Sequence, residues 1–158
     1  MGCGTRRGGE NGKRETELQV VEGFLLKQAQ AGARLWQISS PKVLLREDLR
    51  EAQLQEPRME FFQKKTRSAV LNARAGKLDT RTQDVYFSTQ VVLLSFQQGL
   101  TLKANSLQYK ASSGKIYSHE KVLLEKRGSM TEAEGLEAKP DLSEITFKKQ
   151  QTRFLSEK

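Results

Sequence analysis

Apolar and polar residues alternate along most of the chain from Leu18 onward. Apolar side chains recur at every second position in three consecutive stretches, namely Val92, Leu94 and Phe96, then Leu100, Leu102 and Ala104, then Leu107, Tyr109 and Ala111. A period of two residues is typical of strands that bury one face, because successive side chains of a strand point to opposite sides. The sequence therefore predicts an all-β fold.

Glycine residues separate the alternating stretches. Gly99 and Gly128 each fall between two predicted strands, and residues 112–115 have the Ser-Ser-Gly-Lys composition of a hairpin turn. One segment, residues 44–55, is ambiguous, since its leucines recur amid charged residues at a spacing that also suits a helix. We expect a pair of strands there, with a helix as the alternative.

A repeat underlies the pattern. The matching stretches are 99–117 with 128–146, 71–86 with 102–117 and, more weakly, 35–38 with 70–73. About four such units fit between Gly23 and Leu155. A single unit cannot bury its apolar face, so neighbouring units must stack to form a continuous core. We expect a twisted roll of short antiparallel strands, open at both ends, with chance similarity between alternating strands as the alternative.

Composition limits the size of this core. The chain has 158 residues, of which 36% are hydrophobic and 29% are charged, so we expect one thin, extended domain. Residues 1–17 are rich in glycine and charge and have no periodicity, and we interpret them as a disordered leader. The β-domain is expected to span residues 18–155, followed by a short tail at residues 156–158.

The net charge of +8 is concentrated near the two ends. Residues 1–14 and 145–158 carry +3 each, whereas residues 15–144 hold 19 basic and 17 acidic side chains. Basic stripes with interleaved aromatic residues, which are typical of nucleic-acid platforms, do not occur in the middle of the chain. We therefore expect no nucleic-acid binding.

Residues that carry catalytic or metal chemistry are few. His119 is the one histidine and Cys3 the one cysteine, too few for a zinc site or for a nucleophile, base and acid acting together. Glu132 and Glu134 would share one face of a strand, which a solvated surface explains. The longest apolar run, Val91–Leu94, is far too short for a membrane helix. We expect no enzyme, no metal and no cofactor.

Four stretches carry the most recognisable motifs: Ala33–Ile38; Pro57 with Met59–Phe62; Leu100–Lys110 with Gly114–Ser118 and Lys121–Leu124; and Gly128–Leu136. Together, from about Gly23 to Leu155, they resemble the LptC family of lipopolysaccharide-export proteins. The motifs are patterned rather than strict. The sister protein LptA shares the fold, so an LptA-like bridge stays open, as does a structural β-solenoid that binds protein edges without lipid.

The resemblance implies a twisted, OstA-like β-jellyroll of stacked antiparallel hairpin layers, open along one side. Its apolar interior would bind the acyl chains of lipid A during transport of lipopolysaccharide. Its N-terminal edge would pair with LptF, within a transporter that also contains LptG and the ATPase LptB, and its C-terminal edge with LptA. The family is periplasmic and normally has an N-terminal membrane helix, which this sequence does not show; a homodimer is left open.

Two sets of candidate residues follow. Alternation and resemblance predict a lipid-binding groove lined by Leu54, Leu71, Val85, Phe87, Leu102, Leu107, Ile116 and Ser118. Leu54 and Ser118 rest on the resemblance alone. Gly128, Phe147 and Phe154 are predicted at the partner-binding edge, with an ordinary turn glycine as the alternative for Gly128. Ordinary core packing is the alternative for the groove, because a core and a lipid groove need the same side chains.

Overall fold

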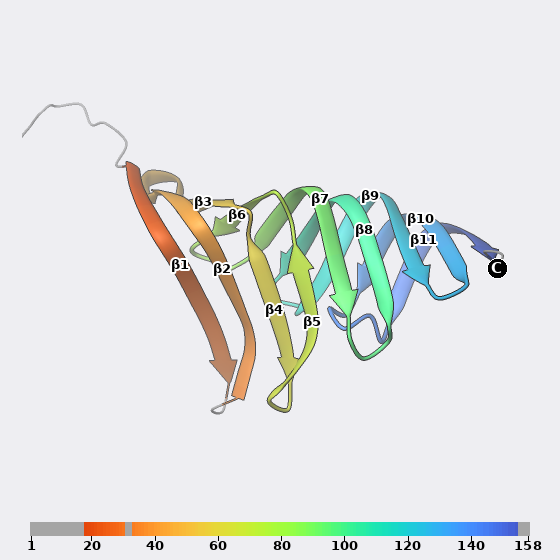
Figure 1. Ribbon diagram of the computed structural model, residues 1–158. Coiled ribbons are helices and arrows are strands. Elements are labelled where there is room, and N and C mark those ends of the chain that lie inside the picture. Colours follow the sequence, from red (N-terminus) through yellow and green to blue (C-terminus); the bar gives the residue numbers. More distant parts are fainter. Residues whose placement is uncertain (1–17, 31–32, 155–158) are drawn as a thin grey trace, which may run out of the picture.

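The computed structural model describes residues 18–30 and 33–154. Within them, eleven antiparallel strands form one sheet with a single short 3₁₀ helix, which confirms the all-β prediction (Figure 1). The strands are β1 (Leu18–Gln30), β2 (Ala33–Arg46), β3 (Glu51–Gln55), β4 (Arg58–Gln63), β5 (Thr66–Asn72), β6 (Ala75–Asp79), β7 (Val85–Ser95), β8 (Leu100–Lys110), β9 (Lys115–Lys126), β10 (Ser129–Ala138) and β11 (Ile145–Phe154). The predicted leader and tail, residues 1–17 and 156–158, lie outside the described residues.

The sheet is folded along its length into two walls. β2 pairs with β4 along one half and with β3 along the other, and β7 pairs in the same way with β5 and β6. Between β2 and β7, one wall is formed by the paired strands β4 and β5, and the other by the paired strands β3 and β6. From β7 to β11 each strand pairs with the next. We call the two sides the β4–β5 wall and the β3–β6 wall.

Irregular residues mark the line along which the sheet folds. β7 has a bulge at Thr89 and Gln90, whose φ angles are 68° and 52°. The pairing of β8 with β9 is interrupted between Ala104 and Gln108, and that of β10 shifts at Gly135, where φ is 77°. Bulges and positive φ bend a strand sharply. Each long strand can therefore pass from one wall to the other.

Residues 44–55 form a strand pair, as expected. β2 ends at Arg46, the 3₁₀ helix η1 makes one turn at Glu47–Leu49, and β3 pairs back on β2. Arg50, with φ of 51°, ends that turn. The helical alternative for this segment is therefore wrong.

Apolar side chains fill the space between the walls. Burial alternates along the strands: in β7, Val85 and Phe87 are buried, whereas Tyr86 between them is 49% exposed. Leu71 and Leu102, two positions matched by the repeat, are both buried. One continuous core runs from β2 to β10, and each fully buried large side chain contributes about 1.5–3 kcal/mol.

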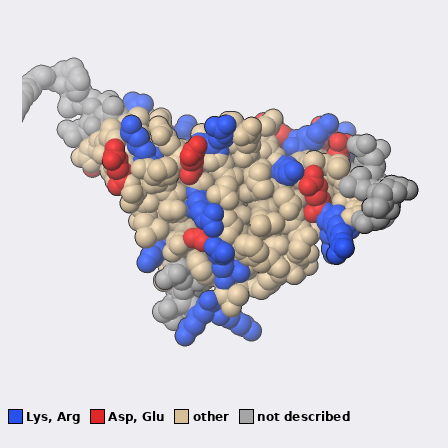
Figure 2. Space-filling view, viewed as in Figure 1, with Lys and Arg blue, Asp and Glu red and all other residues tan. Residues whose placement is uncertain are grey.

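Charged side chains lie on the outside of the walls. Figure 2 shows Lys and Arg side chains over β4 and β5, extending to the lower end of that hairpin. Among them, Glu60 is ion-paired with Arg67 at 2.7 Å and with Arg58 at 3.7 Å. Partial burial would raise the pKa of Glu60, but hydrogen bonds from Arg67 and Gln37, together with the Arg58 charge, hold this pKa below its ordinary value. The cations of this wall therefore outnumber its anions, and Glu60 pairs with two of them.

Candidate functional site

The eight residues predicted to line a lipid groove all lie in the interior. Their exposed fractions range from 0 to 4%, and they come from β3, β5, β7, β8 and β9. The polar member, Ser118, accepts a hydrogen bond at its Oγ from the backbone N of Glu120 at 3.3 Å. All eight thus belong to one packed interior, and their contact with lipid stays a prediction.

Opposite the fold line, the free edges of the two walls meet along a line that we call the seam. The edge of the β4–β5 wall carries the hairpin turns at residues 64–65 and 96–99. The edge of the β3–β6 wall carries the loops at residues 111–114 and 139–144. Within the described residues no strand pairs across the seam, so only side chains and one loop join the two edges.

The loop that crosses the seam is residues 139–144, between β10 and β11, which we call the strap. Its Asp141 is 4% exposed. The Asp141 Oδ2 accepts a hydrogen bond from Gln63 Nε2 at 2.8 Å, and its backbone O accepts one from Ser95 Oγ at 2.6 Å. Gln63 ends β4 and Ser95 ends β7, so the strap ties the edge of one wall to the edge of the other.

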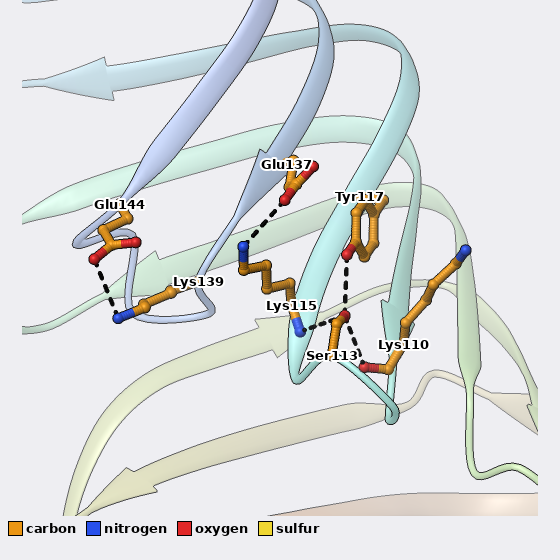
Figure 3. Close-up of polar contacts among 7 residues, drawn as sticks. All are labelled: Lys110, Ser113, Lys115, Tyr117, Glu137, Lys139 and Glu144. Atoms are coloured by element: carbon orange, nitrogen blue, oxygen red, sulfur yellow. Dashed lines mark hydrogen bonds and ion pairs between the residues drawn. The ribbon is translucent and has the colours of Figure 1, made fainter.

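Contacts within the strap hold its shape. The Asp141 Oδ1 accepts hydrogen bonds from the backbone N and the Oγ of Ser143, at 3.0 and 2.7 Å. Lys139 and Glu144, at the two ends, form an ion pair at 3.2 Å (Figure 3). Leu142 has a φ of 62° and is 3% exposed, packed against the core. The strap is therefore a well-ordered loop whose Leu142 side chain packs into the core.

Three aromatic rings meet beside the strap. Tyr109 of β8 contacts Trp36 of β2 and Phe61 of β4, with ring centroids 5.9 and 5.7 Å apart. Burial raises the pKa of the Tyr109 phenol, so this ring is neutral at physiological pH. The rings line a cavity of about 360 Å³, which we call the mouth; its wall also includes Leu35, Phe62, Gln63, Ser68, Ser113, Gly114, Lys115, Lys139, Pro140 and Asp141.

Two other depressions on the surface are larger than the mouth. One, of about 760 Å³, is lined in part by the exposed Val20 and Tyr86, and another, of about 720 Å³, is lined in part by Gly23 and Pro41. Of the eight predicted groove residues, Leu54 alone lines one of these three cavities. The other seven are buried in the packed interior, away from these three cavities.

The predicted partner edge lies at the last strand. Phe147 of β11 is partly buried against the core, opposite Leu136 of β10. Gly128 has a φ of 82° in the turn between β9 and β10, which is the geometry of an ordinary turn glycine. The side chain of Phe154 lies outside the described residues, although its backbone pairs with Ser129. In the described part of the chain, β11 pairs with β10 alone and β1 with β2 alone, so each has an unpaired edge.

Residues that carry catalytic chemistry are dispersed. His119 is exposed on β9, and Cys3 lies outside the described residues. Among residues 18–30 and 33–154, no group of three or more His, Cys, Asp or Glu side chains is arranged to hold a metal ion. In the same two segments, none of the helical structure is long and apolar enough to cross a membrane.

The sequence did not reveal the seam. The spacing of Asp141 and Ser143 is typical of a turn in which an Asp side chain binds the backbone two residues on, and this was the one local signal. Gln63, which donates a hydrogen bond to Asp141 across the seam, lies 78 residues before it in the sequence. No local pattern connects two such residues.

Comparison with known proteins supplies the family. A family model described as "Lipopolysaccharide-assembly, LptC-related" matches residues 13–154, a range that includes all eleven strands. A search of curated proteins gave no significant match. The resemblance found in the sequence is thus confirmed, and the chain belongs to the LptC-related family of lipopolysaccharide assembly, a family of periplasmic, inner-membrane-anchored transport components rather than of enzymes.

Proposed function

We propose that this chain carries lipopolysaccharide from the inner membrane toward the outer membrane and binds the acyl chains of lipid A between its two walls. The seam is the observation that carries the proposal, because the walls are continuous at the fold line but joined by few contacts on the opposite side. The interior is apolar from β2 to β10. Each methylene kept from water contributes about 0.8 kcal/mol, so an apolar path can bind acyl chains without specific polar contacts.

Among the described residues, few hydrogen bonds and ring contacts cross the seam. Asp141 supplies two hydrogen bonds across it, and Tyr109 makes two ring contacts. A hydrogen bond contributes about 0.5–1.5 kcal/mol net, and an aromatic pair about the same. Acyl chains that enter would replace the apolar contacts that the interior loses. The seam is therefore the side of the roll that lipid can open.

The two unpaired edges are the sites for protein partners in this proposal. The free edge of β1 would pair with the β-jellyroll of LptF, in a transporter with LptG and the ATPase LptB that supplies the energy. The free edge of β11 would pair with LptA, close to Gly128, Phe147 and Phe154. Strand addition at both ends would continue the two walls, and the interior between them, into the neighbouring proteins. A homodimer would use the same edges.

The filled interior favours one second candidate function. A structural β-solenoid that pairs its edges with other proteins and binds no lipid needs no opening at the seam, and the eight groove residues would then be ordinary core. The two functions differ in whether lipopolysaccharide binds at all.

Trp36 provides the test, because it is the one tryptophan of the sequence, is 3% exposed and contacts Tyr109 across the seam. Titration with lipopolysaccharide should change its fluorescence emission saturably, as acyl chains separate the two rings. Phosphatidylcholine at the same detergent concentration should produce no saturable change. An unchanged spectrum, with no lipopolysaccharide co-eluting in gel filtration, would favour the lipid-free adaptor.

A further inference from the structure

The mouth joins apolar and cationic surfaces. Trp36, Phe61 and Tyr109 line it, and Lys115 and Lys139 line the same cavity from the edge of the β3–β6 wall. An apolar molecule alone would not need the two cations. The combination suits a ligand with an apolar part inside and an anionic part at the surface.

Carboxylates hold these two lysines at the edge of the mouth. The Lys115 Nζ lies 3.1 Å from Glu137 Oε2, and the Lys139 Nζ lies 3.2 Å from Glu144 Oε2 (Figure 3). The hydrogen bond to Glu137 raises the pKa of Lys115, so this ammonium stays charged at neutral pH. Both ion pairs are solvent-exposed and therefore weak. A doubly charged phosphate group can compete with a single carboxylate for such a lysine.

On the opposite edge, the turn between β4 and β5 contains two lysines in a backbone conformation that lysine disfavours. Gln63 pairs with Thr66, so the turn has two residues, Lys64 and Lys65, with φ angles of 49° and 70°. Two-residue hairpin turns with positive φ at both positions strongly prefer Asn-Gly. Residues in unfavourable backbone conformations concentrate at functional sites. Two lysines thus occupy a turn that Asn-Gly would make more stable.

This turn adjoins the mouth. Gln63, directly before it, lines the mouth and donates to Asp141 of the strap. Lys64 and Lys65 are exposed, and neither forms an ion pair with another of the described residues. Figure 2 shows Lys and Arg side chains projecting at the lower end of β4 and β5. Cations therefore line the mouth on one side of the seam, and on the other side they directly follow Gln63, which lines it.

We propose that Lys64 and Lys65 on one side of the seam, and Lys115 and Lys139 on the other, form a collar that binds the phosphate groups of the lipid A headgroup. The collar rests on the proposed function, in which the acyl chains lie between the walls. Lipid A bears phosphate on both sugars of its headgroup, so one phosphate can face each side of the seam. Lysine binds phosphate as a flexible point charge, which suits a ligand that must move on.

The variant Lys64→Asn/Lys65→Gly separates charge from fold, because it installs the preferred turn sequence while removing both cations. Its melting temperature should rise. Its affinity for diphosphoryl lipid A, measured by displacement of a fluorescent lipid in fixed detergent at low salt, should fall about tenfold. The affinity of the variant for monophosphoryl lipid A should fall by a smaller factor. The matched control, Lys126→Gln/Arg127→Gln, removes the same charge from the exposed end of β9 and the turn that follows it, and should change affinity by less than about twofold.

Lys115→Gln/Lys139→Gln tests the other side of the seam and should show the same selective loss for diphosphoryl lipid A. Equal binding of diphosphoryl lipid A by the wild type and both collar variants would overturn the collar while leaving acyl-chain binding in place. A wild type that binds neither lipid A would overturn the proposed function, and the collar with it. Vesicles of phosphatidylglycerol that bind as tightly as diphosphoryl lipid A, with the same loss in the variants, would show general attraction to anionic lipid and also overturn the collar.

Discussion

A cross-link across the seam should abolish the uptake of lipopolysaccharide. With Gln63→Cys and Asp141→Cys in a Cys3→Ser background, a short cleavable bis-thiol reagent would join the end of β4 to the strap, where the native side chains are 2.8 Å apart. The joined walls cannot separate, so acyl chains cannot reach the interior. We expect the amount of lipopolysaccharide that co-elutes in gel filtration to fall to background, and cleavage of the reagent to restore it.

Two controls isolate the effect of closing the seam. The same double variant without the reagent lacks the native hydrogen bond and should bind lipopolysaccharide at least as well as the wild type. A cross-link between Lys103→Cys and Glu125→Cys joins neighbouring strands on the outside of one wall, where the native ion pair measures 3.5 Å, and should leave uptake unchanged. Full uptake by the protein closed at residues 63 and 141 would show that lipid does not enter through the seam.

The second large effect concerns the stability of the filled interior. Phe87→Ala should lower the free energy of unfolding by about 3–5 kcal/mol, because Phe87 is 1% exposed at the centre of the core. Phe96→Ala, at a ring that is 46% exposed, should lower it by less than about 1 kcal/mol. Urea denaturation followed by circular dichroism measures both.

A loss below about 1 kcal/mol for Phe87→Ala would mean that the interior is loosely filled even without lipid. Loss of the cation–π contact with Arg67, whose guanidinium lies 5.1 Å from the Phe96 ring centroid, contributes the small effect expected for Phe96→Ala. The pair of variants thus compares interior packing with an exposed ring on the same fold.

Alternation in the sequence predicted the strands but did not always indicate which of their faces is buried. The apolar series at the end of β7 lies on the outside, since Leu94 and Phe96 are 41% and 46% exposed whereas Leu93 is buried. Leu102 and Leu107 are both interior although they are five positions apart, because the pairing of β8 with β9 is interrupted between them. The eight groove candidates are all buried. Burial alone, however, does not distinguish a lipid-binding path from an ordinary core. The sequence pattern therefore identified interior residues but not whether they bind lipid.

The division of one sheet into two walls was not predictable from the pattern. Thr89 and Gln90 bend β7 with positive φ although neither is glycine, so the local sequence carries no turn signal there. Lys64 and Lys65 form a turn that usually requires Asn-Gly. In both places, pairing with neighbouring strands overrides the local preference of the residues.

The seam depends on residues far apart in the chain. Tyr109 is 73 positions from Trp36 and 48 from Phe61 in sequence, and the three rings meet because the folded sheet brings its two edges together. The strap closes over Gln63 and Ser95 for the same reason. Such contacts follow from the folded shape, which sequence periodicity does not contain.

Photo-cross-linking from two adjacent residues of β8 can show whether lipopolysaccharide lies between the two walls. Leu102 is 1% exposed between the walls, whereas the side chain of Lys103 is 49% exposed on the outside. A diazirine amino acid of leucine size at position 102 keeps the core filled, as a charged residue would not. During lipopolysaccharide loading, we expect lipid adducts at position 102 and none at position 103. Adducts at position 103 alone, or bound lipid without adducts at position 102, would show that lipid does not lie between the walls.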